Sequence, residues 1–238
     1  MIKASAGERI GGRLLDIGCG IGVYLERLSQ FSALSQGIEF DFSHACSARE
    51  KGLSLTQAAG ERLPFPEDTF DLVLSHEVLE HVEDDKASLR EIVRVLKTPH
   101  PESGQPGGRL ILFVPNKGYP VETHGIYLRG RYRFGNIPLI NYLPRGIRNK
   151  LAPHVRVYTR RDLDRLFSKL PVRIVERKII FGAYDNLIAK WSRLGRGIRW
   201  LLHKLENTPL QFFGLSHYWV LERISPPGEI QGKIQDPA

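Results

Sequence analysis

The residues from Leu14 to Gly22, LLDIGCGIG, combine one acid with three alternating glycines. Asp16 ends an apolar run, and Gly18, Gly20 and Gly22 lead into a stretch with helical character. A strand, a glycine turn and a helix start let the backbone approach a ligand closely, because glycine has no β-carbon. The segment therefore predicts a ligand-binding turn at the carboxyl end of a strand.

A second acid, Glu39, lies seventeen residues after Gly22 at the end of an apolar segment, GIEF. A carboxylate at this place can accept hydrogen bonds from two ribose hydroxyls, so the sequence predicts a nucleoside-containing cofactor. Dinucleotide folds use the spacing G-x-G-x-x-G, whereas the spacing here is G-x-G-x-G. Asp16 would also suit a cationic amino-acid group better than a pyrophosphate.

Further blocks follow in order, LPFPEDTFDLVLSHEVLEHV at 63–82, EIVRVLK at 91–97 and GGRLILFVPN at 107–116. With the glycine turn they resemble the class I S-adenosylmethionine-dependent methyltransferases of the type 11 group, which includes ubiquinone- and menaquinone-pathway enzymes. The resemblance covers residues 12–116 and continues more weakly over 154–167. It implies a methyl transfer (EC 2.1.1.-) with S-adenosyl-L-methionine as cofactor.

The resemblance also assigns roles to residues. Asp16 would face the methionine ammonium, Glu39 would bind the ribose hydroxyls, and Phe40 would pack on adenine. Relatives often have an aspartate at the position of Ala59, so backbone groups or Glu61 would have to replace its contact with the adenine amine, or affinity is lower. The full set of implied cofactor residues is Asp16, Gly18, Cys19, Gly20, Glu39, Phe40, Ala59, Gly60, Glu61, Ser75, His76 and Glu77.

The segment EVLEH places Glu77, Glu80 and His81 where a helix would bring them to one face. His81 is the candidate catalytic base, because histidine titrates near neutral pH and suits proton removal from a phenol. We expect no metal here. The alternative is a divalent metal on these three residues and His154, or His124, as the resemblance implies for some relatives. His81 could also cap a helix or satisfy the core.

Length and composition are those of a single globular domain with a full sheet, at 238 residues and 42% hydrophobic content. The two cysteines, Cys19 and Cys46, give no disulfide framework, and Cys19 fits as a small residue of the turn. The first residues contain no apolar leader, and no run approaches the ~20 apolar residues that span a bilayer. We therefore expect a cytoplasmic protein, with peripheral contact at the inner membrane face as an option.

Charge is divided unevenly along the chain. Residues 1–120 carry 13 basic and 17 acidic side chains, whereas residues 121–238 carry 21 basic and 9 acidic ones. No acid occurs between Glu122 and Asp162. A surface of one sign attracts phosphate groups, nucleic acid or anionic lipid. The alternative is a solvated basic face without a partner.

Apolar runs and helical periodicity alternate along the chain, which predicts right-handed β-α-β crossovers and a Rossmann-like, doubly wound, mostly parallel α/β sheet. The resemblance adds that the seventh strand is antiparallel. The expected strands are near 13–17, 36–40, 53–58, 70–75, 108–114, 172–180 and 217–224. The expected helices are near 22–31, 43–51, 85–97 and 160–169.

We predict one domain over residues 1–224, with the cofactor-binding core at 12–116 and a disordered tail at 225–238. Substrate or lid insertions are expected at 117–158, which is basic and aromatic, and at 184–212. The second contains an amphipathic basic helix, which could pack on its own sheet, on an anionic membrane or on a second subunit. Only about a dozen residues precede the first strand, so the N-terminal helices that cover the cofactor in relatives must be replaced or the lid is incomplete.

The favoured function is methyl transfer to a small acceptor, apolar or lipid-like. An RNA methyltransferase that uses the basic half is the main alternative, although no RNA-binding module is recognisable. A non-catalytic cofactor-binding protein is a further alternative. The glycine spacing and Asp16 argue against a nucleotide-dependent oxidoreductase. The acceptor, the methylated atom and the oligomeric state stay open.

Overall fold

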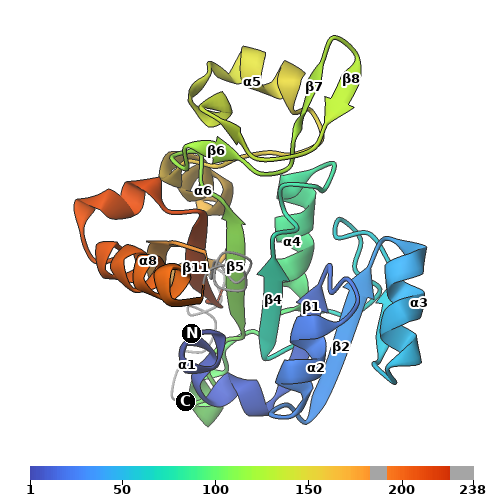
Figure 1. Ribbon diagram of the computed structural model, residues 1–238. Helices are drawn as coiled ribbons and strands as arrows, with labels where there is room; N and C mark the ends of the chain where they lie inside the picture. The colour runs from blue at the N-terminus through green and yellow to red at the C-terminus, as the bar shows by residue number, and fades with distance from the viewer. Residues whose placement is uncertain (183–191, 226–238) are drawn as a thin grey trace, which may run out of the picture.

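The computed structural model describes residues 1–182 and 192–225, which form an α/β fold around one seven-stranded sheet (Figure 1). The strand order is β10-β11-β5-β4-β1-β2-β3. β11 runs antiparallel to both of its neighbours, and the central pairs are parallel. The predicted Rossmann-like sheet is confirmed. Its strands are β1 (Arg13–Ile17), β2 (Leu34–Glu39), β3 (Leu55–Gln57), β4 (Leu72–His76), β5 (Arg109–Pro115), β10 (Val172–Ile180) and β11 (Ser216–Arg223).

Helices cover both faces of this sheet. α4 and α6 bury apolar side chains against one face, whereas α1, α2 and α3 do so against the other. Side-chain caps fix two of the starts: Asp84 accepts hydrogen bonds at the beginning of α4, and Thr159 forms a capping box with Asp162 at α6. The elements are α1 (Ile2–Ala6), η1 (Gly7–Gly11), α2 (Val23–Ser29), α3 (Phe42–Glu50), α4 (Asp85–Val95), η2 (Pro101–Ser103) and α6 (Arg160–Phe167).

The core consists of two apolar layers, one on each face of the sheet. Consecutive strand residues point to opposite faces. Leu14 therefore packs with α1, α2 and α3, whereas Leu15 packs with α4 and α6. On β11, Tyr218 belongs to the same layer as Leu14, and Trp219 belongs to the same layer as Leu15. The seven expected strands and four expected helices are all present, with ends shifted by a few residues.

Residues 117–158 form a lobe above the carboxyl end of β5 (Figure 1). Short antiparallel pairs join β6 to β9 and β7 to β8. Ile126, Ala152 and Val155 give the lobe a small apolar cluster of its own. The lobe contains β6 (Val121–Glu122), β7 (Ile126–Leu128), β8 (Arg131–Arg133), β9 (Ile137–Pro138), η3 (Ile140–Tyr142) and α5 (Arg145–Leu151).

The second insertion is described from residue 192 onward, as α8 (Ser192–Leu205) and η4 (Pro209–Phe213). The first part of the predicted amphipathic helix, residues 187–191, and the tail from residue 226 lie outside the described residues. Among the described residues, no helix is long and apolar enough to cross a membrane.

The N-terminal helix α1 lies at the amino end of β5, far from the carboxyl edge of the sheet (Figure 1). Arg109, the first residue of β5, donates a hydrogen bond to the carbonyl of Ser5 at 2.8 Å. Because α1 does not reach the glycine turn, the lobe of residues 117–158 is the described segment that stands above the carboxyl edge.

Candidate active site

The glycine turn joins β1 to α2 at the carboxyl edge of the sheet. Gly18 and Gly20 have φ angles of 63° and 54°, a left-handed backbone that favours glycine. A β-carbon at Gly18 would lie 2.4 Å from Cγ2 of Val78, whereas one at Gly20 would meet nothing within 4 Å. The turn is thus packed at Gly18 and open at Gly20. Burial raises the pKa of the Cys19 thiol to about 12, so this thiol is no nucleophile.

Glu39 ends β2 and lies beside the glycine turn, because β1 and β2 pair Ile17 with Ile38. Its Oε2 accepts a hydrogen bond from the Gly20 amide at 2.8 Å, and its Oε1 accepts one from the Asp41 amide at 2.9 Å. Each carboxylate oxygen has a second lone pair. The structure therefore brings the acid and the turn together and leaves acceptor capacity for the hydroxyls of a ligand.

Asp16 is a buried acid, 2% exposed, next to the turn. Its Oδ2 has no hydrogen-bond partner among the described residues. Burial raises the pKa of Asp16 to about 7; the Leu25 amide opposes this shift, and the charge of Glu39 reinforces it. An ionised carboxylate without a counter-charge is costly to bury. This orphaned oxygen fits the ammonium group that S-adenosylmethionine carries.

The residues implied for the adenine lie along β2 and the segment after β3. Phe40 is 75% exposed and is therefore no part of the core. The Ala58 amide donates to the Glu39 carbonyl at 3.1 Å, which keeps the segment of Ala59 and Gly60 next to Phe40. A face on which an aromatic ring is exposed at the edge of the glycine turn suits a planar base.

Glu61 has a further contact that the sequence does not reveal. Its Oε1 accepts a hydrogen bond from the Glu83 amide at 2.6 Å and a longer one from the Asp84 amide at 3.3 Å. Glu61 thereby fixes the segment just before α4. Its predicted contact with adenine would have to use the other carboxylate oxygen.

At the end of β4, Ser75 is buried and His76 packs between two aromatic rings. The His76 ring centroid lies 4.6 Å from that of Tyr24 and 4.5 Å from that of Phe113. Its Nε2 is 3.3 Å from the Tyr24 hydroxyl. Burial lowers the pKa of His76, and the charge of Glu77 only partly opposes this, so the ring is neutral at pH 7. His76 therefore lines the site as an uncharged ring at neutral pH.

The helical face considered for EVLEH does not form, because residues 77–84 are a loop and α4 begins at Asp85. Glu77 has a φ of 56°, and its amide donates to the Phe113 carbonyl at 3.0 Å. This left-handed residue turns the chain away from a helical path. The Glu77 carboxylate accepts a 2.7 Å hydrogen bond from the hydroxyl of Ser216, on β11.

Beyond Glu77, the loop meets the lobe at Glu80, His81 and His124, whose ligand-type atoms all lie within 4.8 Å of one another. Glu80 is 1% exposed, and its carboxylate has no hydrogen-bond partner among the described residues. Burial, together with the charge of Glu77, raises the pKa of Glu80 well above its usual value. The site thus holds a buried acid whose neutral form is favoured, next to an exposed histidine.

The predicted set of metal ligands is only partly assembled. Of the two candidates for the further ligand, His124 joins Glu80 and His81, whereas Nε2 of His154 contacts the His124 carbonyl at 3.1 Å. Glu77 lies outside the group and bonds to Ser216 instead.

His81 is on the rim of the site, with a side chain that is 45% exposed, so the alternative that it satisfies the core is wrong. Its Nδ1 lies 3.3 Å from the His154 carbonyl. Because a carbonyl only accepts, this contact places the proton of the neutral ring on Nδ1 and leaves a lone pair on Nε2. Burial, and secondarily His124, lowers the pKa of His81. The ring is therefore neutral and able to take a proton at pH 7.

Sequence patterns did not reveal the partners that hold these groups in place. Ser216 is 139 residues from Glu77, and Tyr24 is 52 residues from His76. Arg156 also ties the lobe to the loop, since its side chain donates to the Glu83 carbonyl at 2.7 Å. Contacts of this kind depend on strand order and leave no local signal in a single sequence.

Comparisons with known proteins agree with this geometry. A methyltransferase domain model matches residues 15–101. The demethylmenaquinone methyltransferase of Corynebacterium kroppenstedtii is 35% identical over 100 residues, 42% of this chain and 40% of that protein. The ubiquinone biosynthesis O-methyltransferase of Brucella anthropi is 26% identical over 189 residues, 77% of this chain and 68% of that protein. This chain thus spans well under half of the first relative and about two thirds of the second.

A solved S-adenosylmethionine-dependent methyltransferase from Mesorhizobium loti has the same fold, with a TM-score of 0.62 at 20% identity. The superposition covers 92% of this chain and 95% of that one. The chain is thus similar to S-adenosylmethionine-dependent methyltransferases in the matched domain and in fold.

Proposed function

We propose that this chain is a methyltransferase that transfers a methyl group from S-adenosylmethionine to a hydroxyl of a small apolar acceptor. The acceptor would lie between the loop of residues 77–84 and the lobe of residues 117–158. The single observation that carries the cofactor assignment is the buried, unpartnered Oδ2 of Asp16 beside the open side of Gly20. When bound, the cofactor supplies an activated methyl group on a sulfonium, so the chain has only to align, desolvate and deprotonate.

Each part of the cofactor has a matching group in the structure. Asp16 would take the ammonium and Glu39 the ribose hydroxyls. Phe40 would cover one face of the adenine. His76 and Glu77, at the end of β4, would border the methionine part.

The hydroxyl acceptor is supported by His81. Its Nε2 lone pair points to the junction of loop and lobe, where an acceptor hydroxyl can lose its proton as the methyl group is transferred. From the lobe, His124 lies at this junction. Tyr132 contacts His124, because its hydroxyl donates a hydrogen bond to the His124 carbonyl at 2.6 Å. An O-methyltransferase among the relatives agrees with this assignment.

The same cluster could instead hold a divalent metal on Glu80, His81 and His124. Hard and borderline cations accept this mixture of carboxylate and imidazole ligands. In that case the metal would neutralise the buried Glu80 and position the acceptor oxygen. Dialysis against a chelator separates the two roles, because only a metal-dependent enzyme loses activity and recovers it with added cation.

An anionic membrane surface is the source that we propose for an apolar acceptor. Large apolar side chains of α8 and η4 are exposed, and Arg196 and Lys204 on α8 add positive charge. These apolar residues are Trp200, Leu201, Leu210, Phe212 and Phe213. Co-sedimentation with vesicles of phosphatidylglycerol, compared with phosphatidylcholine alone, tests this contact.

The first experiment is a thermal melt with S-adenosylhomocysteine and, in parallel, with NAD. A ligand at about 100 times its Kd stabilises the fold by about 2.7 kcal/mol, which raises Tm by a few degrees. We expect a shift with S-adenosylhomocysteine alone; a shift with NAD alone would refute the proposal. Radiolabelled methyl transfer to a panel of alkylated phenols and catechols then identifies the acceptor class.

A further inference from the structure

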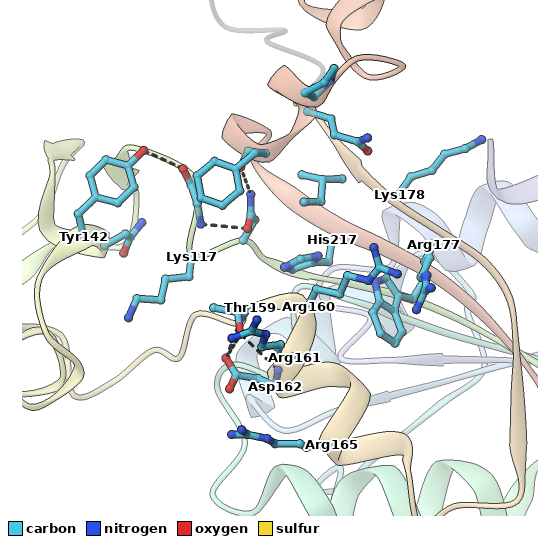
Figure 2. A pocket seen from close by; sticks show the side chains of 18 of the residues that line it. Lys117, Tyr142, Thr159, Arg160, Arg161, Asp162, Arg165, Arg177, Lys178 and His217 are labelled. Carbon is cyan, nitrogen blue, oxygen red and sulfur yellow. Dashed lines mark hydrogen bonds between the residues drawn. The ribbon is translucent and has the colours of Figure 1, made fainter.

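A hollow with a volume of about 900 Å³ lies between α6, β10, η4 and the base of the lobe (Figure 2). None of the residues assigned to the cofactor lines it. On β11, Ser216 contacts Glu77 of the active site, whereas its neighbour His217 lines the hollow. Because consecutive strand residues face opposite sides, the strand separates this hollow from the Glu77 contact.

The hollow is lined by cations. Figure 2 shows that they come from the loop after β5, from α6 and from β10. Asp162 is the one acid among the lining residues. The cationic residues are Lys117, Arg145, Arg160, Arg161, Arg165, Arg177 and Lys178.

The carboxylates within reach neutralise only part of this charge. Asp162 is committed to the capping box of α6 and to an ion pair with Arg145. Arg177 and Lys178 pair with Asp164 and Glu176. In the part of the chain that the structure describes, no acid pairs with the lining residues that remain: Lys117, Arg160, Arg161 and Arg165.

Lys117 shows that the hollow concentrates positive potential. Its backbone is fixed, since its amide donates to the Tyr158 carbonyl at 2.9 Å, and its side chain is half-buried. Burial, together with the charge of Arg145, lowers the pKa of Lys117. Cations held at close range in a concave, partly desolvated site favour the entry of an anion.

Two exposed aromatic rings form the other wall. Tyr142 is 44% and Phe212 53% exposed, and both are anchored. The Tyr142 hydroxyl donates to the Gly118 carbonyl at 2.9 Å, and Nδ2 of the Asn116 side chain donates to the Phe212 carbonyl at 2.8 Å. A hollow of this volume is larger than an inorganic anion needs and has room for an attached organic group.

We propose that this hollow binds a phosphate or diphosphate that carries an apolar group, at a site separate from the methyl-transfer site. Guanidinium and ammonium groups together provide bidentate and point-charge contacts for phosphoryl oxygens. Tyr142 and Phe212 would contact the apolar part. The phosphate can come from the headgroup of a membrane lipid or from a soluble molecule, and the two sources offer the same chemistry to these cations.

Isothermal titration calorimetry tests the site, with saturating S-adenosylhomocysteine present to block the cofactor cleft. The probes are inorganic diphosphate and dihexanoyl phosphatidic acid, a soluble lipid. We expect both to bind, the lipid more tightly, with affinity that falls as salt rises. Vesicles with and without phosphatidic acid then distinguish the sources: binding to the vesicles indicates a membrane lipid, and binding of the soluble probes alone indicates a soluble phosphate.

The test variant is Lys117→Gln with Arg160→Gln, which removes one cation from the loop after β5 and one from α6. The matched control, Arg27→Gln with Arg90→Gln, removes equal charge from exposed positions on α2 and α4. We expect the test variant to bind both probes at least about tenfold more weakly and the control to bind as wild type does. Both should keep the wild-type Tm shift with S-adenosylhomocysteine, which shows that they fold.

The proposal is overturned if neither probe binds wild type, or if the control loses as much affinity as the test variant. Binding of a single-stranded oligonucleotide in place of both probes would also overturn it, in favour of a nucleic-acid surface. The calorimetry measures binding to the hollow directly, so its result does not depend on whether the chain transfers methyl groups. Conversely, absence of binding in the hollow would leave the proposed methyl transfer untouched.

Discussion

Glu122 and Arg148 form an ion pair at 2.5 Å in which each side chain is 1% exposed. The pair joins β6 to α5 and so holds the lobe together from within. The other Glu122 oxygen accepts hydrogen bonds from the His124 amide at 3.0 Å and from its Nδ1 at 3.2 Å. The pair therefore links the folding of the lobe to the position of His124 opposite His81.

Loss of one partner of this pair should be costly, because it leaves the other charge buried. Arg148→Met is expected to lower the free energy of unfolding by about 3–5 kcal/mol, measured in urea. Arg148→Met combined with Glu122→Gln should lose less than the two single variants together, since no buried charge remains. The control Arg90→Met, in an exposed pair with Asp84 at 4.0 Å, should change stability by less than about 1 kcal/mol.

The pair also predicts how stability depends on acid. Burial alone would raise the pKa of Glu122, but the hydrogen bonds from His124 and the pair with Arg148 outweigh it and lower this pKa to about 2. An acid whose pKa is lower in the folded state than in the unfolded state stabilises the fold at pH values above the unfolded pKa. The contribution should disappear as the pH falls from about 4.5 towards 2, and Glu122→Gln should remove that part of the acid slope. An unchanged slope in the variant would contradict this assignment.

Asp16 should have the opposite pH dependence, since its pKa is raised to about 7 by burial. The folded state then binds a proton that the unfolded state releases, so stability falls as the pH rises from about 4 to 7. Ligand-free Asp16→Asn should be more stable than wild type at pH 8, on the order of 1–3 kcal/mol, and about equal near pH 4, where the wild-type carboxyl is protonated to a large extent in both states.

Asp16→Asn should also bind S-adenosylhomocysteine at least about tenfold more weakly, because the ammonium group of the ligand loses its charged partner. Chemical unfolding at the two pH values and calorimetry at pH 8 check both results. A variant that is destabilised at both pH values, or that binds the ligand normally, would show that Asp16 serves the fold alone.

Alanine at Gly20 can test a role in cofactor binding separately from a role in folding, because its β-carbon would meet no other atom of the protein within 4 Å. Gly20 and Gly52 both have positive φ, at 54° and 78°, and a β-carbon on either would meet nothing within 4 Å. Alanine at either position should therefore cost about 1 kcal/mol of stability from backbone strain. We expect Gly20→Ala alone to weaken S-adenosylhomocysteine binding, in a calorimetric comparison with Gly52→Ala. Equal affinities in the two variants would place the cofactor elsewhere.

The sheet and the cofactor turn could be predicted from the sequence because their signals are local. Apolar runs that end in Asp16 and Glu39, with glycines between them, mark β1, β2 and the turn without any knowledge of other segments. The order of the blocks then fixes a parallel sheet. The two acids meet because neighbouring parallel strands end at the same edge.

The acceptor side could not be predicted in this way. The spacing of Glu77 and His81 fits a helix, but a tie between the Glu77 amide and Phe113 on β5 imposes a left-handed turn. The lobe has strands of two or three residues, such as Val121–Glu122, which are too short for alternation to be recognised. His124 meets His81 only because Glu122 is held by Arg148, and this pair is 26 residues apart in the chain.

His81 gives the last prediction, because its protonation state distinguishes a base from a metal ligand. Burial and His124 lower its pKa, so kcat/KM should rise along an acid limb centred below 6.5 and stay level above it. His81→Gln should lose this limb and about 10²–10⁴-fold in kcat/KM while it keeps the Tm shift with S-adenosylhomocysteine. The control His44→Gln, on the exposed side of α3, should match wild type. Activity that a chelator abolishes and a divalent cation restores would assign His81 to a metal instead, because a base needs no cation to accept a proton.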